Sequence, residues 1–259
     1  MKRKILFYVI AISLLIGCSK PEANPAYPGK VMDEPDTKVE ETLTAEEQDK
    51  IIKEFYNLLV GNKDEDTIIK FIDGNISKLD IENADTVVLE MEDYLIRKSS
   101  DLTHTYEIVS KYKDYTSNEI KSYMDLIRLE SENIYTDGEN LNIGLEELLN
   151  RALNAEKHLK EYSTGKTKKK VYDLYEAYIY GAILGSGNQY IYANEGTLII
   201  KDEVLNIYKD FVAENEGTYV AKILSSYLEE IDLDQGNLNG ENVIYFYENI
   251  IEIIRLNTK

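Results

Sequence analysis

The stretch NIGLEELLNRALNAEKHLKEY, residues 142–162, decides the fold because its apolar side chains recur at helical spacing. Repeats of three and four residues along one helical face connect most of these side chains: Leu145, Leu148, Leu149, Ala152, Leu153 and Leu159. The same spacing recurs along most of the chain from residue 44 onward. The sequence therefore predicts an all-α fold, a helical bundle or stacked helical hairpins of about eight helices.

Signals for helix ends accompany these patterns. In LTAEEQDKIIKEFYNLLVG (43–61), Thr44 precedes two glutamates, as an N-cap residue does where acidic side chains face the positive end of the helix dipole. Gly61 is expected to end that helix. The best strand candidate is GTLIIK (196–201), and it is short. Strands are therefore expected to contribute little.

The first 18 residues have the organisation of a secretory signal. MKRK is basic, and the thirteen residues that follow it, ILFYVIAISLLIG, carry no charge. A bilayer span needs about 20 apolar residues, so a permanent transmembrane helix is the weaker interpretation. LIGC, residues 15–18, resembles the lipobox of bacterial lipoproteins, with Leu15 three places before the cysteine and Gly17 immediately before it.

This resemblance implies a processing route. The signal peptide, residues 1–17, is cut off, and Cys18 receives a diacylglyceryl group with fatty acyl chains such as palmitate. Two acyl chains give stable anchoring, so the resemblance implies attachment to the membrane through Cys18, on the outer face of the bacterial cell membrane. Cys18 is the sole cysteine, so the mature chain has no thiol left for disulfides, zinc ligation or catalysis.

The region after the cysteine is expected to be a tether. Residues 18–44 contain all four prolines and almost no large apolar side chains, a composition too poor in apolar surface to offset the entropy of ordering. An extended arm packed along the domain is the alternative. No linker-like composition follows, so residues 45–259 are predicted to form a single helical domain.

The charge balance limits the partners. Lys and Arg number 29 against 48 Asp and Glu, a formal net charge of −19. Such a surface repels nucleic acid, so no nucleic-acid partner is expected. It favours cationic partners, divalent ions or basic protein patches, although an acidic surface also serves simply to keep a helical protein in solution.

Tyrosines are concentrated in VYDLYEAYIYGAILGSGNQYIY, residues 171–192. Ala177, Gly181 and Gly185 lie four apart and form a stripe of small side chains on one helix face. Glycine within a helix costs roughly 1 kcal/mol relative to alanine, so another element should approach closely there. That element is either a neighbouring helix or a ligand. The ligand hypothesis names these binding residues: Tyr175, Tyr178, Gly181 and Tyr190.

A second candidate site is the polar segment DLDQGNLNGEN, residues 232–242. Clustered carboxylate and amide oxygens suit Ca²⁺, but the segment does not fit the EF-hand spacing. The hypothesis is a non-standard calcium site formed by Asp232, Asp234, Asn237 and Asn239. The alternative is an ordinary polar turn between two helices.

Motifs of known catalytic sites are missing from the sequence, and no catalytic residue is assigned. The chain has two histidines, and His158 with Glu161 one turn later is interpreted as part of a solvated polar face. Two functions remain. The favoured one is a lipid-anchored extracytoplasmic binding domain for an envelope protein, a peptide or a small ligand. The other is a cell-envelope glycan-active enzyme with paired carboxylates, one of them in an apolar wall of a cleft.

Overall fold

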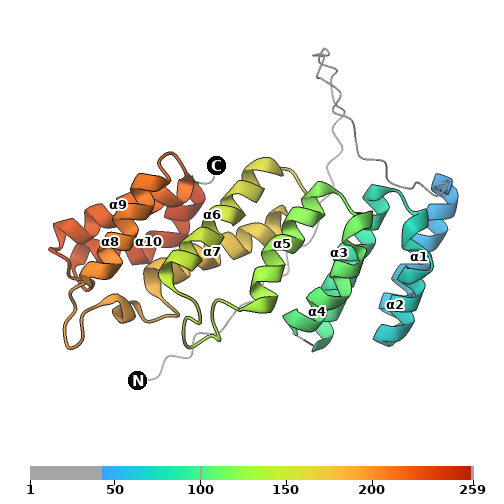
Figure 1. Ribbon diagram of the computed structural model, residues 1–259, viewed down its shortest axis with the longest axis horizontal. Coiled ribbons are helices and arrows are strands. Elements are labelled where there is room, and N and C mark those ends of the chain that lie inside the picture. The colour runs from blue at the N-terminus through green and yellow to red at the C-terminus, as the bar shows by residue number, and fades with distance from the viewer. Residues whose placement is uncertain (1–42, 100, 258–259) are drawn as a thin grey trace, which may run out of the picture. The chain divides into compact units, whose positions relative to one another are not determined.

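The helical periodicity of the sequence is realised in a computed structural model, which describes residues 43–99 and 101–257 (Figure 1). Within these ranges the chain forms ten α-helices and no β-strand, which confirms the predicted all-α fold. Cys18 and all but the last two residues of the predicted tether lie outside the described residues. The boundaries predicted for the signal peptide and the tether therefore stay predictions.

The ten α-helices and three short 3₁₀-helices have the following bounds. They are α1 (Ala45–Val60), α2 (Glu65–Asp73), η1 (Ile76–Lys78), α3 (Ile81–Ser99), α4 (Leu102–Val109), η2 (Ser110–Tyr115), α5 (Asn118–Glu132), α6 (Leu145–Glu161), α7 (Lys168–Leu184), η3 (Gln189–Tyr192), α8 (Asp202–Glu214), α9 (Tyr219–Leu233) and α10 (Glu241–Asn257).

Local chemistry sets several helix ends, and both predicted ends of α1 are confirmed. Thr44 and Glu47 form a capping box at the start of α1, and Gly61 ends that helix. Ser117 caps α5 through its side chain. The segment from Asp202 to Leu233 breaks into α8 and α9, with Gly217 at φ +89° in the intervening turn. This break is one reason for a helix count above eight.

The predicted strand GTLIIK (196–201) is replaced by isolated bridges. Ala193 pairs with Ile200, and Ile199 pairs with Asn237. The first bridge lies within the loop between α7 and α8, and the second joins that loop to the turn between α9 and α10. A short apolar run thus forms local pairings without a second strand that would extend them.

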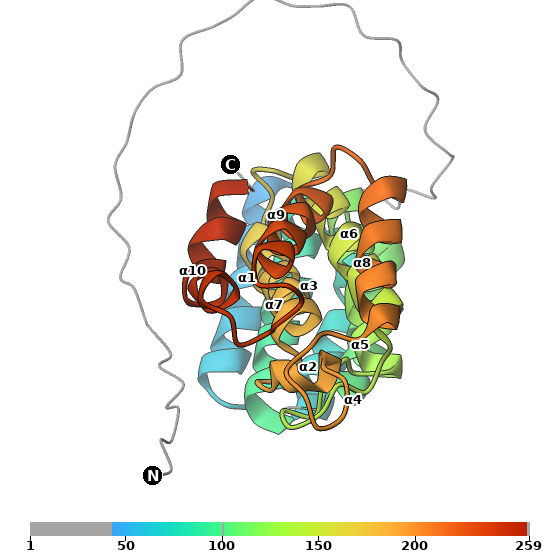
Figure 2. The ribbon, with the colours of Figure 1, turned by 90° about the vertical axis from the view of Figure 1, so that its left-hand side faces the viewer.

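Most helices that are neighbours in the chain are also neighbours in space, although α3 packs more closely against α1 than against α2, and α8 more closely against α6 and α9 than against α7. In Figure 1 they follow one another from α1 and α2 at one end of the described domain to α8, α9 and α10 at the other. Helices α6 and α7 form the most extensively packed pair. Figure 2, seen from the α8–α10 end, shows α8 and α10 on either side of α9.

Two hydrophobic cores lie one after the other along this array. The N-terminal core consists of the buried apolar residues of α1 to α5, from Phe55 to Met124. The C-terminal core consists of those of α5 to α10, from Tyr123 to Ile254. Helix α5 belongs to both cores, because Met124 packs into the first and Tyr123 into the second.

Candidate functional site

An open groove of about 570 Å³ runs between α5 and α6. We call it the α5–α6 groove and define it by its lining residues: Asn118, Lys121, Ser122, Asp125, Leu126, Arg128, Leu129, Asn154, Lys157, His158, Glu161 and Tyr162. Most of these side chains are polar or charged. A groove of this size admits a small ligand or a short peptide.

The two walls of the groove run antiparallel. The last turn of α5 contacts the first half of α6, where Arg151 Nη1 lies 2.6 Å from Glu130 Oε1. The first turn of α5 contacts the segment just after α6, where the Thr167 hydroxyl donates to Glu119 Oε1 over 2.7 Å. The middle of each helix therefore faces the middle of the other.

Both walls present the same order of side-chain chemistry. From its N-terminal end, each helix has an amide side chain, a lysine, a hydrogen-bonding side chain and an acid. Successive members are three, one and three residues apart in both helices. On α5 these residues are Asn118, Lys121, Ser122 and Asp125, and on α6 they are Asn154, Lys157, His158 and Glu161. In antiparallel helices this order places both lysines near the centre of the groove and one acid toward each end.

His158 lies at the centre, and the prediction that it belongs to a solvated face is wrong. Only 2% of the residue is exposed, because α5 and the residues before α7 cover it. Its Nδ1 lies 2.9 Å from Ser122 Oγ and its Nε2 lies 2.8 Å from Thr167 Oγ1. Both ring nitrogens therefore have hydrogen-bond partners, as a buried polar group requires.

The direction of these hydrogen bonds follows from the carboxylate of Glu119, the last group in this series of hydrogen bonds. A carboxylate oxygen of Glu119 accepts from the Thr167 hydroxyl and also from the Thr167 backbone N–H. Since the Thr167 proton is used there, its oxygen accepts from Nε2–H of His158. Nδ1 then carries the lone pair, and it accepts the hydroxyl proton of Ser122.

Burial lowers the pKa of His158, an effect larger than the opposing effects of Glu119 and Glu161. The imidazole is therefore neutral at pH 7. The two central lysines, Lys121 and Lys157, make no hydrogen bond or ion pair with any residue in the described part of the chain. The centre of the groove thus combines a neutral base, a hydroxyl and two free ammonium groups.

The predicted ligand residues of α7 lie in the C-terminal core. Tyr175 and Tyr178 have no exposed surface, and Gly181 is also buried. The Tyr178 hydroxyl donates to Glu130 Oε1 over 2.7 Å, whereas the buried Tyr175 hydroxyl has no partner among the described residues. The side chain of Tyr190 lies outside the described part of the structure. A ligand at these positions would have to open the core, and this site stays a prediction.

Close helix packing accounts for the small residue at Gly181. A Cβ atom added there would lie 3.2 Å from Leu148 Cδ2 on α6 and 3.5 Å from Tyr135 Cε2. Gly185 ends α7 at φ +63°, where a side chain would be strained. The glycines thus serve the α6–α7 contact and the helix end.

The predicted calcium residues lie in the turn between α9 and α10. Asp234 Oδ2 accepts the backbone N–H of Val243, and Oδ1 accepts from Asn242 Nδ2. Asn237 Oδ1 accepts the backbone N–H of Asn239, while Asp232 is exposed. Within the described residues no three His, Cys, Asp or Glu side chains are arranged to hold a metal. The oxygens of Asp234 thus have structural partners, and calcium binding stays a prediction.

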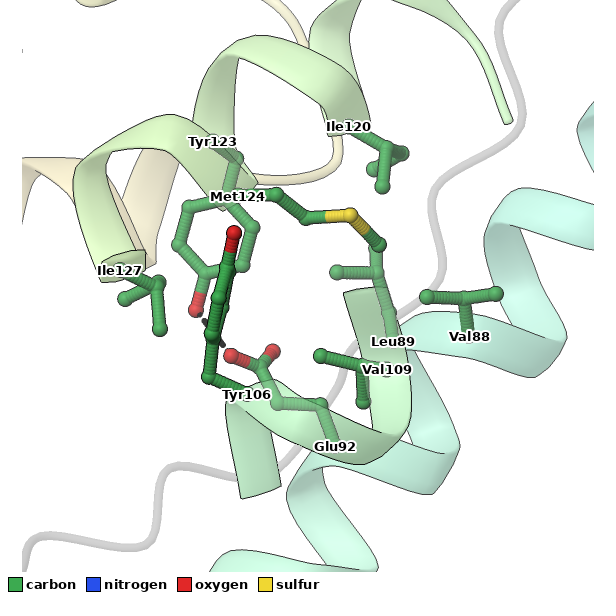
Figure 3. A pocket seen from close by; sticks show the side chains of 9 residues that line it. All are labelled: Val88, Leu89, Glu92, Tyr106, Val109, Ile120, Tyr123, Met124 and Ile127. Carbon is green, nitrogen blue, oxygen red and sulfur yellow. Dashed lines mark hydrogen bonds between the residues drawn. The ribbon is translucent and has the colours of Figure 1, made fainter. Parts of the chain in front are cut away.

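One carboxylate does lie in an apolar wall, that of Glu92 on α3 (Figure 3). Its Oε1 accepts the Tyr123 hydroxyl over 2.7 Å, and its Oε2 forms an ion pair with Lys170 Nζ at 3.1 Å. The adjoining cavity is lined mainly by apolar side chains: Val88, Leu89, Val109, Ile120, Met124 and Ile127, with the ring of Tyr106. Its volume is about 10 Å³, room for one water molecule and not for a sugar ring.

Comparisons with known proteins add no relative. No family model, no curated protein and no solved structure matches the chain. Among residues 43–99 and 101–257, no helix combines the length and the apolar character that crossing a membrane requires. The functional argument therefore depends on the geometry of the α5–α6 groove and on the sequence before it.

The sequence analysis did not predict the α5–α6 groove, although part of the residue pattern that marks it is present in the sequence. The shared spacing of amide, lysine and acid in the two segments can be read from the letters alone. The sequence does not show the antiparallel packing of α5 and α6, which brings Ser122 to His158, 36 positions apart. Thr167 and Glu119, 48 positions apart, are joined by the same packing.

Proposed function

We propose that this chain is a lipid-anchored protein of the outer face of the bacterial cell membrane, and that it binds a short peptide by its carboxylate in the α5–α6 groove. The observation that carries the binding proposal is the pair of ammonium groups of Lys121 and Lys157, which have no partner among residues 43–99 and 101–257, beside the neutral His158. A carboxylate between them would form charge-assisted hydrogen bonds, which are stronger than neutral ones.

The remaining lining residues suit a peptide. Asn118 and Asn154 offer amide donors and acceptors that can pair with peptide groups. Asp125 and Glu161, toward the two ends of the groove, attract an amino group or a basic side chain. The net charge of −19 makes the rest of the surface unfavourable for polyanions, so the two lysines select a small anionic group over a nucleic acid.

Anchoring is supported by residues 1–18, with their basic start, uncharged run and LIGC. The test is metabolic labelling with a fatty-acid probe in a bacterial host. We expect the wild-type chain to be labelled and cleaved, and the Cys18→Ala variant to remain as an unlabelled precursor. Ser19→Ala serves as the matched control and should be labelled like the wild type. Labelling of Cys18→Ala would contradict the anchor.

Peptide binding is tested with fluorescein-labelled tetra-alanine that ends in a free carboxylate, and with the same peptide ending in an amide. Fluorescence polarisation of the full chain in detergent should show tighter binding of the free acid. We expect Lys121→Ala with Lys157→Ala to weaken that binding about tenfold or more, since hydrogen bonds to charged groups contribute about 1.5–3 kcal/mol.

The matched control for this double variant is Lys53→Ala with Lys209→Ala, two exposed lysines outside the groove. It has the same change in net charge, and its affinity for the acid peptide should equal that of the wild type. Equal affinity for the acid and the amide peptide, or equal weakening in both double variants, would contradict the proposal.

A further inference from the structure

We infer that Ser122 is a nucleophile that attacks acyl groups bound in the α5–α6 groove, with His158 as its general base and with Thr167 and Glu119 as positioning residues. The inference rests on the proposed function, since it requires that the groove admits ligands. It adds a reaction, the hydrolysis of an ester that delivers a carboxylate to the site of the two lysines.

The first step of the argument is the geometry of nucleophile and base. A hydroxyl becomes a useful nucleophile when a base lies within hydrogen-bond reach and a third group orients that base. Ser122 Oγ and His158 Nδ1 are 2.9 Å apart, and Thr167 holds the opposite ring nitrogen at 2.8 Å. Glu119 in turn accepts the Thr167 hydroxyl, which fixes the lone pair of His158 toward Ser122.

The second step is access. His158 and Thr167 are buried, but Ser122 is half-buried and lies in the wall of an open groove. A buried histidine needed only for stability could be satisfied by any two partners of the core. Here one partner belongs to Ser122, a half-buried residue that lines the open groove, so a ligand in the groove can approach the residue that His158 activates.

The third step is charge. Attack on a carbonyl develops negative charge on its oxygen, and stabilising that charge is a large part of catalysis. The α5 backbone N–H groups next to Ser122 are used within the helix, so this stabilisation has to come from side chains. Lys121 and Lys157 line the same groove and have free ammonium groups among the described residues.

The proposed reaction balances with water as the only co-reactant. Ser122 Oγ forms a bond to the ester carbonyl carbon while its proton moves to Nδ1 of His158. The bond from that carbon to the alkoxy oxygen breaks, and the departing alcohol takes the proton from His158. Water then attacks the acyl-serine, and one of its protons passes through His158 to Ser122 Oγ. The carboxylic acid that is released loses its remaining proton to the solvent and becomes a carboxylate.

The test uses a tagged fluorophosphonate on the full chain in detergent, with the labelled residue identified by mass spectrometry. Ser122 Oγ would bond to phosphorus, fluoride would leave, and His158 would take the proton. We expect labelling at Ser122, none at that site in Ser122→Ala, and at least a tenfold slower rate in His158→Gln. Ser226→Ala, which removes an exposed helical serine elsewhere, should be labelled like the wild type.

Two readouts keep the test informative if a variant folds poorly. Ser122→Cys should react with iodoacetamide faster than the doubly substituted Ser122→Cys, His158→Gln chain, because the imidazole takes the thiol proton. Circular dichroism of each variant reports its helix content. Equal thiol reactivity in two well-folded chains would overturn the role of His158.

The positioning role of Glu119 has its own readout, the pH profile of labelling. The charged and titratable groups around His158 come from both walls of the groove: Glu119, Lys121, Asp125 and Arg128 on α5, Lys157 and Glu161 on α6, and Tyr162, whose ring centroid lies 4.8 Å from that of His158. Because the negative charge of Glu119 raises the pKa of His158, Glu119→Gln should move the midpoint of the profile to lower pH. An unchanged midpoint would overturn this role.

The outcomes separate the two proposals. Absence of labelling at Ser122, or equal labelling of the wild type and His158→Gln, overturns the nucleophile. If the acid peptide still binds in a lysine-dependent way, the proposed function stands without it. Labelling at Ser122 that depends on His158 supports the nucleophile, even where tetra-alanine does not bind and the peptide proposal fails.

Discussion

The two cores of the domain differ in where their tyrosine hydroxyls find hydrogen-bond partners. In the N-terminal core the tyrosine hydroxyls bond at its partly exposed margin, as Tyr94 does with the carbonyl oxygen of Lys63 and Tyr112 with Asp73. In the C-terminal core two of them bond deep inside. Tyr208 donates to the Ala182 carbonyl oxygen over 2.6 Å and Tyr192 to that of Gly181 over 2.8 Å.

Buried ionisable groups occur beside both cores, with Asp85 and Glu92 on α3 beside the N-terminal core and a larger set beside the C-terminal core. Arg151, Glu130, Glu156 and His158 are each at most 4% exposed, and all of them lie on α5 and α6, beside the C-terminal core. The contrast teaches where to look for function. Apolar side chains only need to exclude water, whereas a buried polar network has to be satisfied member by member. The network of His158 reaches the surface at Ser122, in the wall of the α5–α6 groove.

The largest effect expected from this contrast is at Arg151. Its substitution by Ala would leave the Glu130 carboxylate buried and without its cation, and breaking a buried pair in this way costs about 3–5 kcal/mol. Guanidinium denaturation of the full chain, read by circular dichroism, should show that loss in the free energy of unfolding.

The control for Arg151 is the doubly substituted Arg151→Met, Glu130→Gln chain, which removes both charges. It should be more stable than Arg151→Ala, since no unpaired charge remains. If Arg151→Ala loses less than about 1 kcal/mol, the network is not what distinguishes the C-terminal core.

A smaller effect is expected from removing single hydroxyls. Tyr208→Phe leaves the ring in place but takes a buried donor from the Ala182 carbonyl oxygen, at a cost of about 1–1.5 kcal/mol. Tyr94→Phe makes the same change at the partly exposed margin of the N-terminal core, where water can replace the lost donor. Equal losses in the two variants, measured by urea denaturation, would remove the contrast between the cores.

The junction between the cores predicts a modest pH effect. Burial raises the pKa of Glu92 above its ordinary value of 4.5, more than the nearby Lys170 lowers it. The folded chain thus binds a proton that the unfolded chain releases, so this contribution to stability is present below pH 4.5 and is lost as pH rises through the folded pKa. Relative to Glu92→Gln, the wild type should lose stability over that range. A constant difference from pH 4 to 8 would contradict this.

The smallest effect is expected at the surface. Lys169 and Asp173 form an exposed i,i+4 pair at 2.7 Å, and such pairs contribute about 0.3–0.5 kcal/mol. Lys169→Ala should therefore change the free energy of unfolding by no more than that, and less at 1 M salt. A loss as large as that of Tyr208→Phe would show that burial is not what ranks the polar contacts of this domain.

Local chemistry made much of the fold predictable. Thr44 and Ser117 cap the starts of α1 and α5, and Gly185 ends α7, each through interactions within a few residues. The apolar spacing of α6 follows from the geometry of a helical turn. The site was not predictable in the same way. The sequence around Tyr178 is compatible with a ligand-binding tyrosine and equally with a core tyrosine. The sequence around His158 predicts an exposed side chain, and only the packing of α5 against α6 shows that it is buried. Contacts between helices decide both cases.

Helix α5 has a consequence for the order in which the chain assembles during synthesis. Its Ile120 and Met124 complete the N-terminal core, while Tyr123 and Leu126 belong to the C-terminal core. Once α5 has emerged, the first core can close, but the opposite side of that helix stays uncovered until α6 and α7 have been made. The folded N-terminal core thus presents a surface against which the C-terminal helices pack. A chain stopped after α5 would leave that apolar side of α5 exposed and prone to aggregate.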